Sequence, residues 1–179
     1  MSQQFPPIVP QEDFGAVHSA VATALDAGDL PPKECEYKAL LPRDPVHIRL
    51  LCITSKENLP LPQLKIIHVQ LKNAPPFEAL SYCWGTGEQE HKITVQGEED
   101  EEDAYVQLTK SLLEALVYIS RFWAISKSEV PARAEHQKYI WIDQICINQK
   151  EDSVQSMSEK AHQISIMDQI YSRAERVLV

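Results

Sequence analysis

The sequence has little glycine, few positive charges and no long apolar run. Only 5 of its 179 residues are glycine, and 26 Asp and Glu against 17 Lys and Arg give a net charge of −9. No stretch of 18 apolar residues occurs, so we predict no membrane-spanning helix and no membrane partner. Because nucleic-acid binding through phosphates needs a basic surface, we also predict no nucleic-acid partner.

The four cysteines lack the close pairing that zinc ligands need, so we expect no metal site. Cys52, Cys83 and Cys146 lie in apolar runs, which predicts buried, reduced thiols. The N-terminus lacks the charged-then-apolar pattern of a secretory signal, and we therefore expect a cytoplasmic protein. No GxSxG, P-loop, HExxH or dinucleotide-binding glycine motif is present.

Composition changes along the chain predict a leader and one domain. Residues 1–36 begin rich in Pro and Gln and contain an amphipathic stretch from Phe14 to Leu25, which is either one helix or a loosely attached segment. Residues 37–179 are expected to form the domain. The run of Asp and Glu at 98–103 is interpreted as a solvated loop, because a block of like charges repels itself.

Short apolar segments bounded by Pro, Gly, Asn or Ser predict strands in the first part of the domain. They are Ile48–Ile53 and Leu64–Leu71, which we expect to form a hairpin, then Phe77–Trp84 and His91–Val95. Further on, a helical stripe predicts a helix over Leu108–Ile119, and a polar connection follows. The remaining predictions are a strand at Tyr139–Ile147, a helix at Ser153–Ala174 and a strand from Arg176 to Val179.

Alternating strands and helices in the second half indicate parallel β-α-β units. The final strand has no helix after it to cover its face. We therefore expect a parallel sheet that is incomplete at its C-terminal side.

Three stretches carry long motifs rich in Trp, Tyr, Cys and Ile. They read FEALSYCWG at 77–85, YIWIDQICINQ at 139–149, and EK..QI..M..IY..A..VLV at 159–179. In this order and spacing they resemble the signatures YEALSYCWG, LWIDALCINQ and EK..QV..M..IY..A..VLV of the fungal heterokaryon incompatibility (HET) domain family. The third motif includes Glu159, Lys160, Gln163, Met167 and Tyr171. Gln107-Leu108 stands where the family usually has Asn-Leu.

This resemblance implies a TIR-like, flavodoxin-like α/β fold, in which a parallel sheet with flanking helices is preceded by short β-strands. Ligands of such sheets sit outside the carboxyl ends of the strands. The resemblance therefore implies a candidate nucleotide pocket formed by side chains that follow two of the expected strands: Ser81, Tyr82, Trp84, Gly85, Asp143, Asn148 and Gln149.

Each candidate also has a structural interpretation. Tyr82 and Trp84 offer an aromatic shelf for a base and ribose, or Trp84 covers the edge of the core while Gly85 makes a turn. Asp143 interrupts an apolar run, and its carboxylate holds a ligand hydroxyl, caps a turn or pairs with an arginine. Asn148 suits a turn equally well.

In the third motif, Gln163, Met167 and Tyr171 are expected mainly to pack. Glu159 and Lys160 fall in the early turns of the expected helix, where Glu159 interacts well with the helix dipole or the pair contributes to a contact between domains.

Three functions follow from the resemblance and stay open on sequence alone. The first is a signalling and cell-death module of fungal non-self recognition that assembles with itself or with protein partners. The second is a TIR-like NAD glycohydrolase, with NAD as substrate and no other cofactor expected. Its catalytic glutamate would lie beyond residue 179, because Glu78, Glu151, Glu159 and Glu175 do not correspond to it. The third is an inactive truncated fragment.

Overall fold

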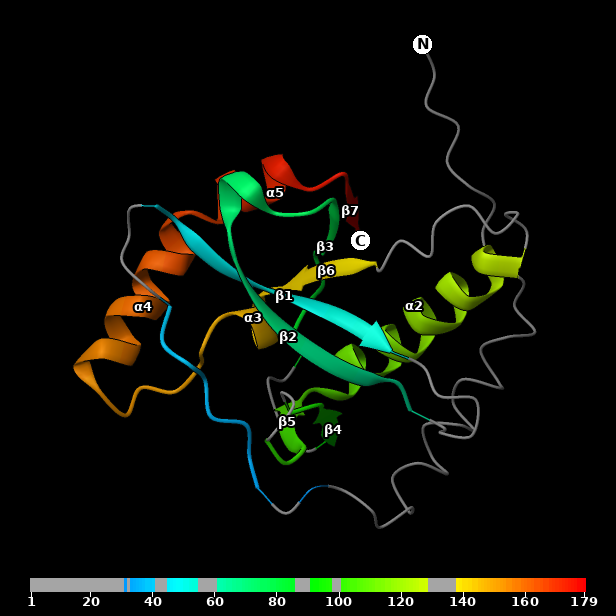
Figure 1. Cartoon of the computed structure of the whole chain (residues 1–179), viewed down its shortest axis with the longest axis horizontal. Helices are drawn as coiled ribbons and strands as arrows, with labels where there is room; N and C mark the ends of the chain where they lie inside the picture. The colour runs from blue at the N-terminus through cyan, green and yellow to red at the C-terminus, as the bar shows by residue number, and fades with distance from the viewer. Residues whose placement is uncertain are drawn as a thin grey trace.

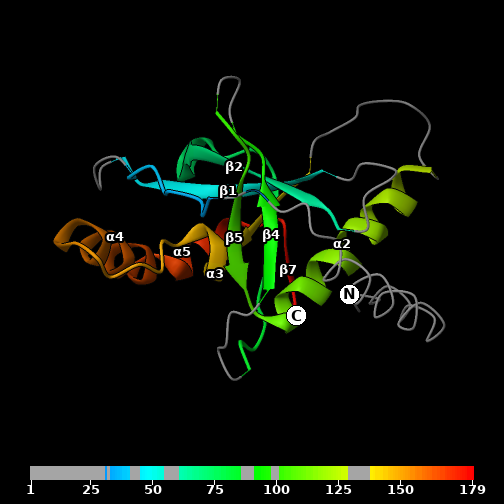
Figure 2. The same cartoon turned by 90° about the horizontal axis from the view of Figure 1, so that it is seen from below.

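The computed structural model describes residues 31, 33–40, 45–54, 61–85, 91–97, 101–128 and 138–179. These residues contain a seven-stranded sheet in the order β5-β4-β2-β1-β6-β3-β7. Helices α2 and α4 lie at opposite ends of the molecule in both views (Figures 1 and 2). The predicted α/β class is therefore confirmed, although the sheet mixes parallel and antiparallel pairs.

The predicted hairpin is confirmed. Strands β1 (His47–Thr54) and β2 (Gln63–Gln70) pair antiparallel along their whole length, from His47 opposite Gln70 to Thr54 opposite Gln63. Ile48, Leu50 and Leu51 of β1 are fully buried. A strand buried on both faces occupies the middle of a sheet, and β1 does so between β2 and β6.

The far end of the sheet contains one strand that the sequence did not predict. β4 (His91–Val95) lies where expected, but β5 (Ala104–Leu108) pairs antiparallel with it and precedes α2. In β5, Val106 and Leu108 are buried while Gln107 is exposed, which is the alternation of a strand. The sequence did not predict this short strand because its last residue, Leu108, also begins the helical stripe.

Besides the parallel pair of β2 and β4, three neighbouring strands at the other end of the sheet run parallel to one another. They are β3 (Phe77–Leu80), which lies in the middle, β6 (Tyr139–Ile142) on one side and β7 (Arg176–Leu178) on the other. The predicted strands ending at Trp84 and Ile147 were too long. The second apolar run instead turns into a short helix α3 (Asp143–Cys146), which buries Gln144, Ile145 and Cys146.

The helices confirm the predicted periodicity, with corrected ends. Helix α2 (Lys110–Ser128) begins and ends later than predicted and buries Leu112, Leu113 and Leu116. The single helix predicted over Ser153–Ala174 consists of two, α4 (Val154–Ser165) and α5 (Met167–Arg173). They are separated at Ile166, whose φ of −112° and ψ of 9° are not helical.

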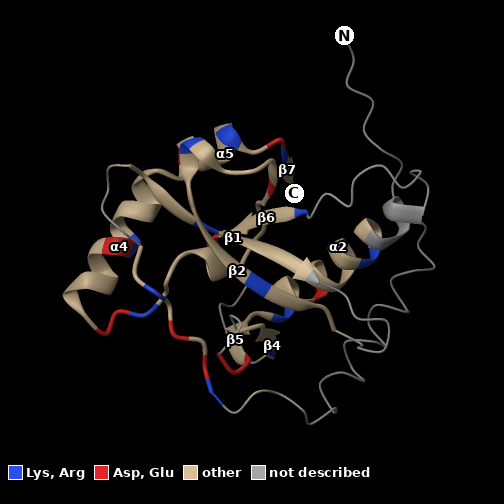
Figure 3. Cartoon of the chain, in the orientation of Figure 1, with Lys and Arg blue, Asp and Glu red and all other residues tan. Residues whose placement is uncertain are grey.

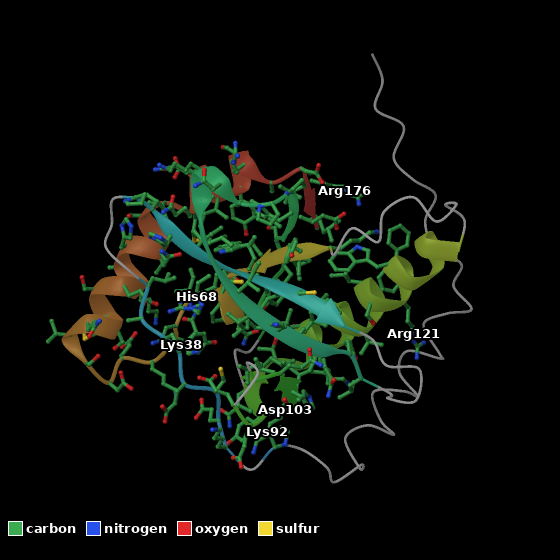
Figure 4. The ribbon with its side chains drawn as sticks, in the orientation of Figure 1. Lys38, His68, Lys92, Asp103, Arg121 and Arg176 are labelled. Carbon is green, nitrogen blue, oxygen red and sulfur yellow. The ribbon has the colours of Figure 1, made fainter. Side chains whose placement is uncertain are left out.

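One seam joins the hairpin to the parallel strands. Strand β1 pairs antiparallel with β6 through Leu51 opposite Ile140 and Cys52 opposite Tyr139. The two ends of the sheet lie on either side of this seam, with Lys92 of β4 at one end and Arg176 of β7 at the other (Figure 4). Between β2 and β3, a short 3-10 helix η1 (Leu71–Asn73) leads the chain out of β2.

Other predictions fall partly or wholly outside the described residues. The Phe14–Leu25 stretch does so entirely, and the proposed boundary at residue 36 stays a prediction. Next to that boundary, Glu34 forms a bridge with Tyr105, and Cys35 N–H donates to the Tyr105 carbonyl at 2.7 Å. In the acidic run, which was interpreted as a solvated loop, Glu101 forms an ion pair with Lys38 at 3.0 Å and so contacts the segment before β1.

Candidate functional site

The carboxyl ends of the parallel strands meet at one edge of the sheet. Ser81, which follows β3, donates its N–H to the Leu178 carbonyl of β7 at 2.8 Å. Four residues later, Gly85 adopts a φ of +66° and turns the chain. On the other side of β3, α3 begins directly after β6 with Asp143. This edge therefore brings together the segments that carry most of the candidate residues.

Asp143 and Trp84 contact each other across this edge. The Trp84 indole Nε1 donates to the two carboxylate oxygens of Asp143 at 3.3 and 3.2 Å, and Gln144 N–H donates to Oδ1 at 2.7 Å. Removal from water raises the pKa of the Asp143 carboxyl, and these hydrogen bonds offset part of that rise. No lysine or arginine in the described part of the chain forms an ion pair with this carboxylate.

A second set of polar groups lies behind this contact. The Tyr82 hydroxyl donates to Gln144 Oε1, which also accepts from the Thr109 hydroxyl at 3.4 Å. Gln144 is 2% exposed, and its Nε2 has no hydrogen-bond partner among the described residues. Burial and the nearby Asp143 charge raise the pKa of the Tyr82 hydroxyl. Sequence reasoning passed over Gln144 and Thr109 as site residues, although Gln144 is a polar residue within an apolar motif.

Tyr171 of α5 reaches the same edge. Its hydroxyl donates to the Leu80 carbonyl at 3.3 Å, and its ring meets Trp141 edge-on at 5.4 Å between centroids. Desolvation raises the pKa of its hydroxyl, and the Asp143 charge acts in the same direction. Tyr171 packs against the core, as the sequence predicted, and its hydroxyl lies beside the candidate pocket residues.

The other two pocket candidates bind backbone groups. Asn148 Oδ1 accepts from Lys150 N–H at 3.0 Å, which is the local turn that the structural interpretation describes. Gln149 Nε2 donates to the carbonyls of Asp143 and Ile147 at 3.2 and 3.1 Å. Gln149 thus holds α3 in place, and Asn148 shapes the loop after it.

The third motif contributes to a buried network that the sequence did not predict. Arg49 of β1 is fully buried and forms an ion pair with Glu159 at 2.8 Å. Its guanidinium also donates to the carbonyls of Cys146 and Lys38 at 3.1 and 2.8 Å and lies 4.9 Å from the Tyr37 ring centroid. A single arginine thereby links β1, α3, α4 and the segment before β1.

Glu159 extends this network to Leu40 in the segment before β1. Its Oε2 accepts from Leu40 N–H at 2.9 Å. One turn further along α4, Gln163 Nε2 donates to the His47 carbonyl at 2.9 Å. Lys160 points elsewhere and pairs with Glu151 at 2.8 Å, and Met167 packs against the core. The motif residues Glu159 and Gln163 thus fix α4 to the sheet through polar contacts.

The cysteine prediction was wrong at one position. Cys52 and Cys146 are buried, but Cys83 is exposed because it follows the end of β3 rather than lying inside a strand. All four cysteines are free thiols. Across the described ranges, no group of three His, Cys, Asp or Glu residues is placed to hold a metal ion. Likewise, none of the helices in those ranges is long and apolar enough to cross a membrane.

Comparison with known proteins identifies related sequences. Residues 77–179 match the family described as heterokaryon incompatibility protein (HET). The chain is 32% identical over 167 residues to heterokaryon incompatibility protein 6, OR allele, of Neurospora crassa. This alignment covers 90% of the chain and 22% of the relative, so the chain spans about a fifth of that protein's length. No solved structure matches the chain.

Proposed function

Because the chain belongs to the heterokaryon incompatibility (HET) family, we propose that it is a signalling module of fungal non-self recognition. In this proposal the domain acts in the cytoplasm, assembles with itself or with protein partners, and triggers cell death when a genetically different partner is met. The name of the Neurospora crassa relative supports an incompatibility-type role.

The observation that carries this proposal is the position of the matched segment in the fold. Residues 77–179 contain the neighbouring strands β3, β6 and β7 and the helices α3, α4 and α5. They therefore include Asp143, Trp84 and Tyr171 at the sheet edge and Glu159 in the buried network. The residues that make up the family's signatures are also those that build the edge and fix α4 to the sheet.

Expression in a filamentous fungus tests the proposal. The full chain is placed under an inducible promoter, and dead hyphal compartments are counted with a vital dye. We expect death to follow induction and to be lost in Arg49→Met, which removes the buried partner of Glu159. The Arg173→Met variant, which alters an exposed arginine, serves as the matched control. Normal viability with abundant folded chain would contradict the proposal.

The Asp143 edge supports a second candidate function, hydrolysis of NAD by a TIR-like enzyme. The order β6-β3-β7 places the first strand of the parallel set between the next two, as flavodoxin-like sheets do. Asp143 is a half-buried carboxylate that binds Trp84 and has no cationic partner among the described residues, and such groups accumulate at functional sites. In this candidate Asp143 binds a ribose hydroxyl, and Trp84 and Tyr82 line the pocket.

Loss of NAD over time, measured with purified folded chain, separates the two candidates. Consumption by the wild-type chain that disappears in Asp143→Asn supports the enzyme. The substitution keeps an acceptor for the Trp84 indole, so the edge retains its packing. NAD that persists in the presence of a chain able to kill hyphae supports the assembly module instead.

A further inference from the structure

Helix α4 presents its apolar side to solvent and its polar side to the protein. The side chains exposed along one face are Val154, Met157, Ala161 and Ile164, with relative exposures of 86%, 53% and 52% for the three large ones. On the opposite face, Ser156 and Gln163 are buried. A surface helix of a globular protein normally has the reverse arrangement.

Polar contacts account for the inward face. Ser153 and Ser156 form a reciprocal capping box at the start of α4. Glu159 binds Arg49 and Leu40 N–H, and Gln163 binds the His47 carbonyl. These bonds hold α4 in position without using its apolar residues. The outward apolar face is therefore left unexplained by the packing of the described residues.

The spacing of the outward residues is that of a helix seam. Positions 154, 157, 161 and 164 follow each other at intervals of three, four and three, as the a and d positions of a heptad repeat do. The stripe is also symmetric about Glu159. A twofold axis crossing the helix there places Val154 of one copy against Ile164 of the other, and Met157 against Ala161. Large residues then meet smaller ones.

Charge on this face permits two copies to approach. The chain has a net charge of −9, yet the exposed neighbours of the stripe are Gln155, Ser158 and Ser165. Lys160, at its margin, is paired with Glu151. Figure 3 shows that most of α4 is free of acidic and basic colouring, and Figure 2 shows the helix at the outer end of the molecule. Antiparallel packing also brings opposite ends of the helix dipoles together.

We propose that α4 is a self-association surface, on which a second copy of this chain packs antiparallel through the stripe formed by Val154, Met157, Ala161 and Ile164. This inference rests on the proposed function, since it names the surface through which the domain assembles with itself.

The size of the surface predicts a weak pair. A helix of 12 residues is about 18 Å long. Two such helices bury less than the roughly 1,200 Å² of a stable standard interface. We therefore expect a dissociation constant on the order of 100 µM. Such a pair is open at low concentration and closes when copies are brought together, which suits a module that signals by assembly.

Charge exchange tests both the surface and its symmetry. Sedimentation equilibrium of the full chain should show a monomer–dimer equilibrium between about 10 µM and 1 mM, which is about tenfold below and above the expected dissociation constant. Val154→Glu and Ile164→Lys should each weaken it about tenfold, because each buries a charge without a partner. The double variant should recover it, since each new carboxylate then faces the ammonium group of the other copy.

Positions 154 and 164 are about 15 Å apart on one helix, so the introduced charges cannot pair within a single chain. Phe122→Glu, at a half-exposed apolar residue of α2, is the matched control and should leave the equilibrium unchanged. A wild-type chain that stays monomeric at 1 mM, about ten times the expected constant, overturns both this surface and self-assembly. Dimers that Val154→Glu does not weaken, or that the double variant does not restore, overturn the surface and leave assembly standing.

Discussion

Glu159 and Asp143 are both carboxylates withdrawn from water, and the protein stabilises them differently. Glu159, with a side chain 9% exposed, faces the guanidinium of a fully buried Arg49 and accepts from Leu40 N–H. Within the part of the chain that the structure describes, Asp143 accepts from neutral donors alone, the Trp84 indole and Gln144 N–H. A buried carboxylate that forms an ion pair with a multiply hydrogen-bonded arginine fixes the structure. A carboxylate that accepts from neutral donors alone keeps the capacity to bind a ligand.

The substitution Arg49→Met should lower the free energy of unfolding more than any other change considered. Replacing Arg49 by Met leaves Glu159 without its cation and removes the donors to Lys38 and Cys146. We expect a loss of about 3–5 kcal/mol in the free energy of unfolding, measured by urea denaturation. Arg173→Met, at an exposed position, should change it by less than about 0.5 kcal/mol. An equal effect at the two positions would remove the distinction between buried and exposed arginine.

Glu159→Gln should have the next largest effect. The amide still offers an oxygen to Leu40 N–H but leaves the Arg49 charge unpaired, at a cost of about 2 kcal/mol. Because the pair is buried, the loss should change little between low and high salt. Lys160→Met, which breaks an exposed pair with Glu151, serves as the comparison. A loss at position 159 that salt abolishes would place this pair in contact with solvent.

Asp143→Asn should change the free energy of unfolding less than Glu159→Gln, and by an amount that depends on pH. The folded-state pKa of Asp143 is raised, so ionising the carboxyl costs more in the folded chain than in the unfolded one. The wild type should therefore lose stability relative to the variant as pH rises from about 4 through the folded-state pKa. Parallel denaturation curves from acid to neutral pH measure this. A wild type that gains stability relative to the variant as pH rises would contradict the prediction.

The smallest effect concerns access rather than stability. Cys83 is exposed beside Trp84 at the sheet edge, whereas Cys146 is buried in α3 and its pKa is raised to about 12, mainly by desolvation. Iodoacetamide should modify Cys83 in the native chain and Cys146 only after unfolding, as followed by mass spectrometry of peptides. Rapid native modification of Cys146 would show that the Arg49 side opens to solvent as readily as the Asp143 edge.

The spacing of apolar residues and the three sequence motifs predicted much of this fold. Alternation and bounding residues identified the hairpin, β4 and the parallel strands, and the motifs placed Trp84 and Asp143 at the same edge. The Tyr139–Ile147 run did not reveal where β6 gives way to α3, because residues of either element are buried there. An apolar run buried throughout carries no period from which to tell a strand from a helix.

The contacts that escaped prediction are those made across long sequence separations. Nothing around Arg49 in its apolar strand indicates that Glu159, on a helix far along the chain, is its partner. Gln144 lay inside a recognised motif, yet only the fold brings Tyr82 and Thr109 to it. Polar residues inside apolar runs were the available signal in both cases, and the sequence supplied no partner to match with them.

The seam between β1 and β6 also sets the order in which the chain can fold during synthesis. The hairpin of β1 and β2 is complete once residue 70 has been made, but one edge of β1 waits for Tyr139 and Ile140. Translation of the intervening residues takes on the order of 10 s at ribosomal rates. During that interval an unpaired, apolar strand edge is open to other nascent chains. Slower translation between these strands should therefore lower the soluble yield, and chaperones that cover strand edges should restore it.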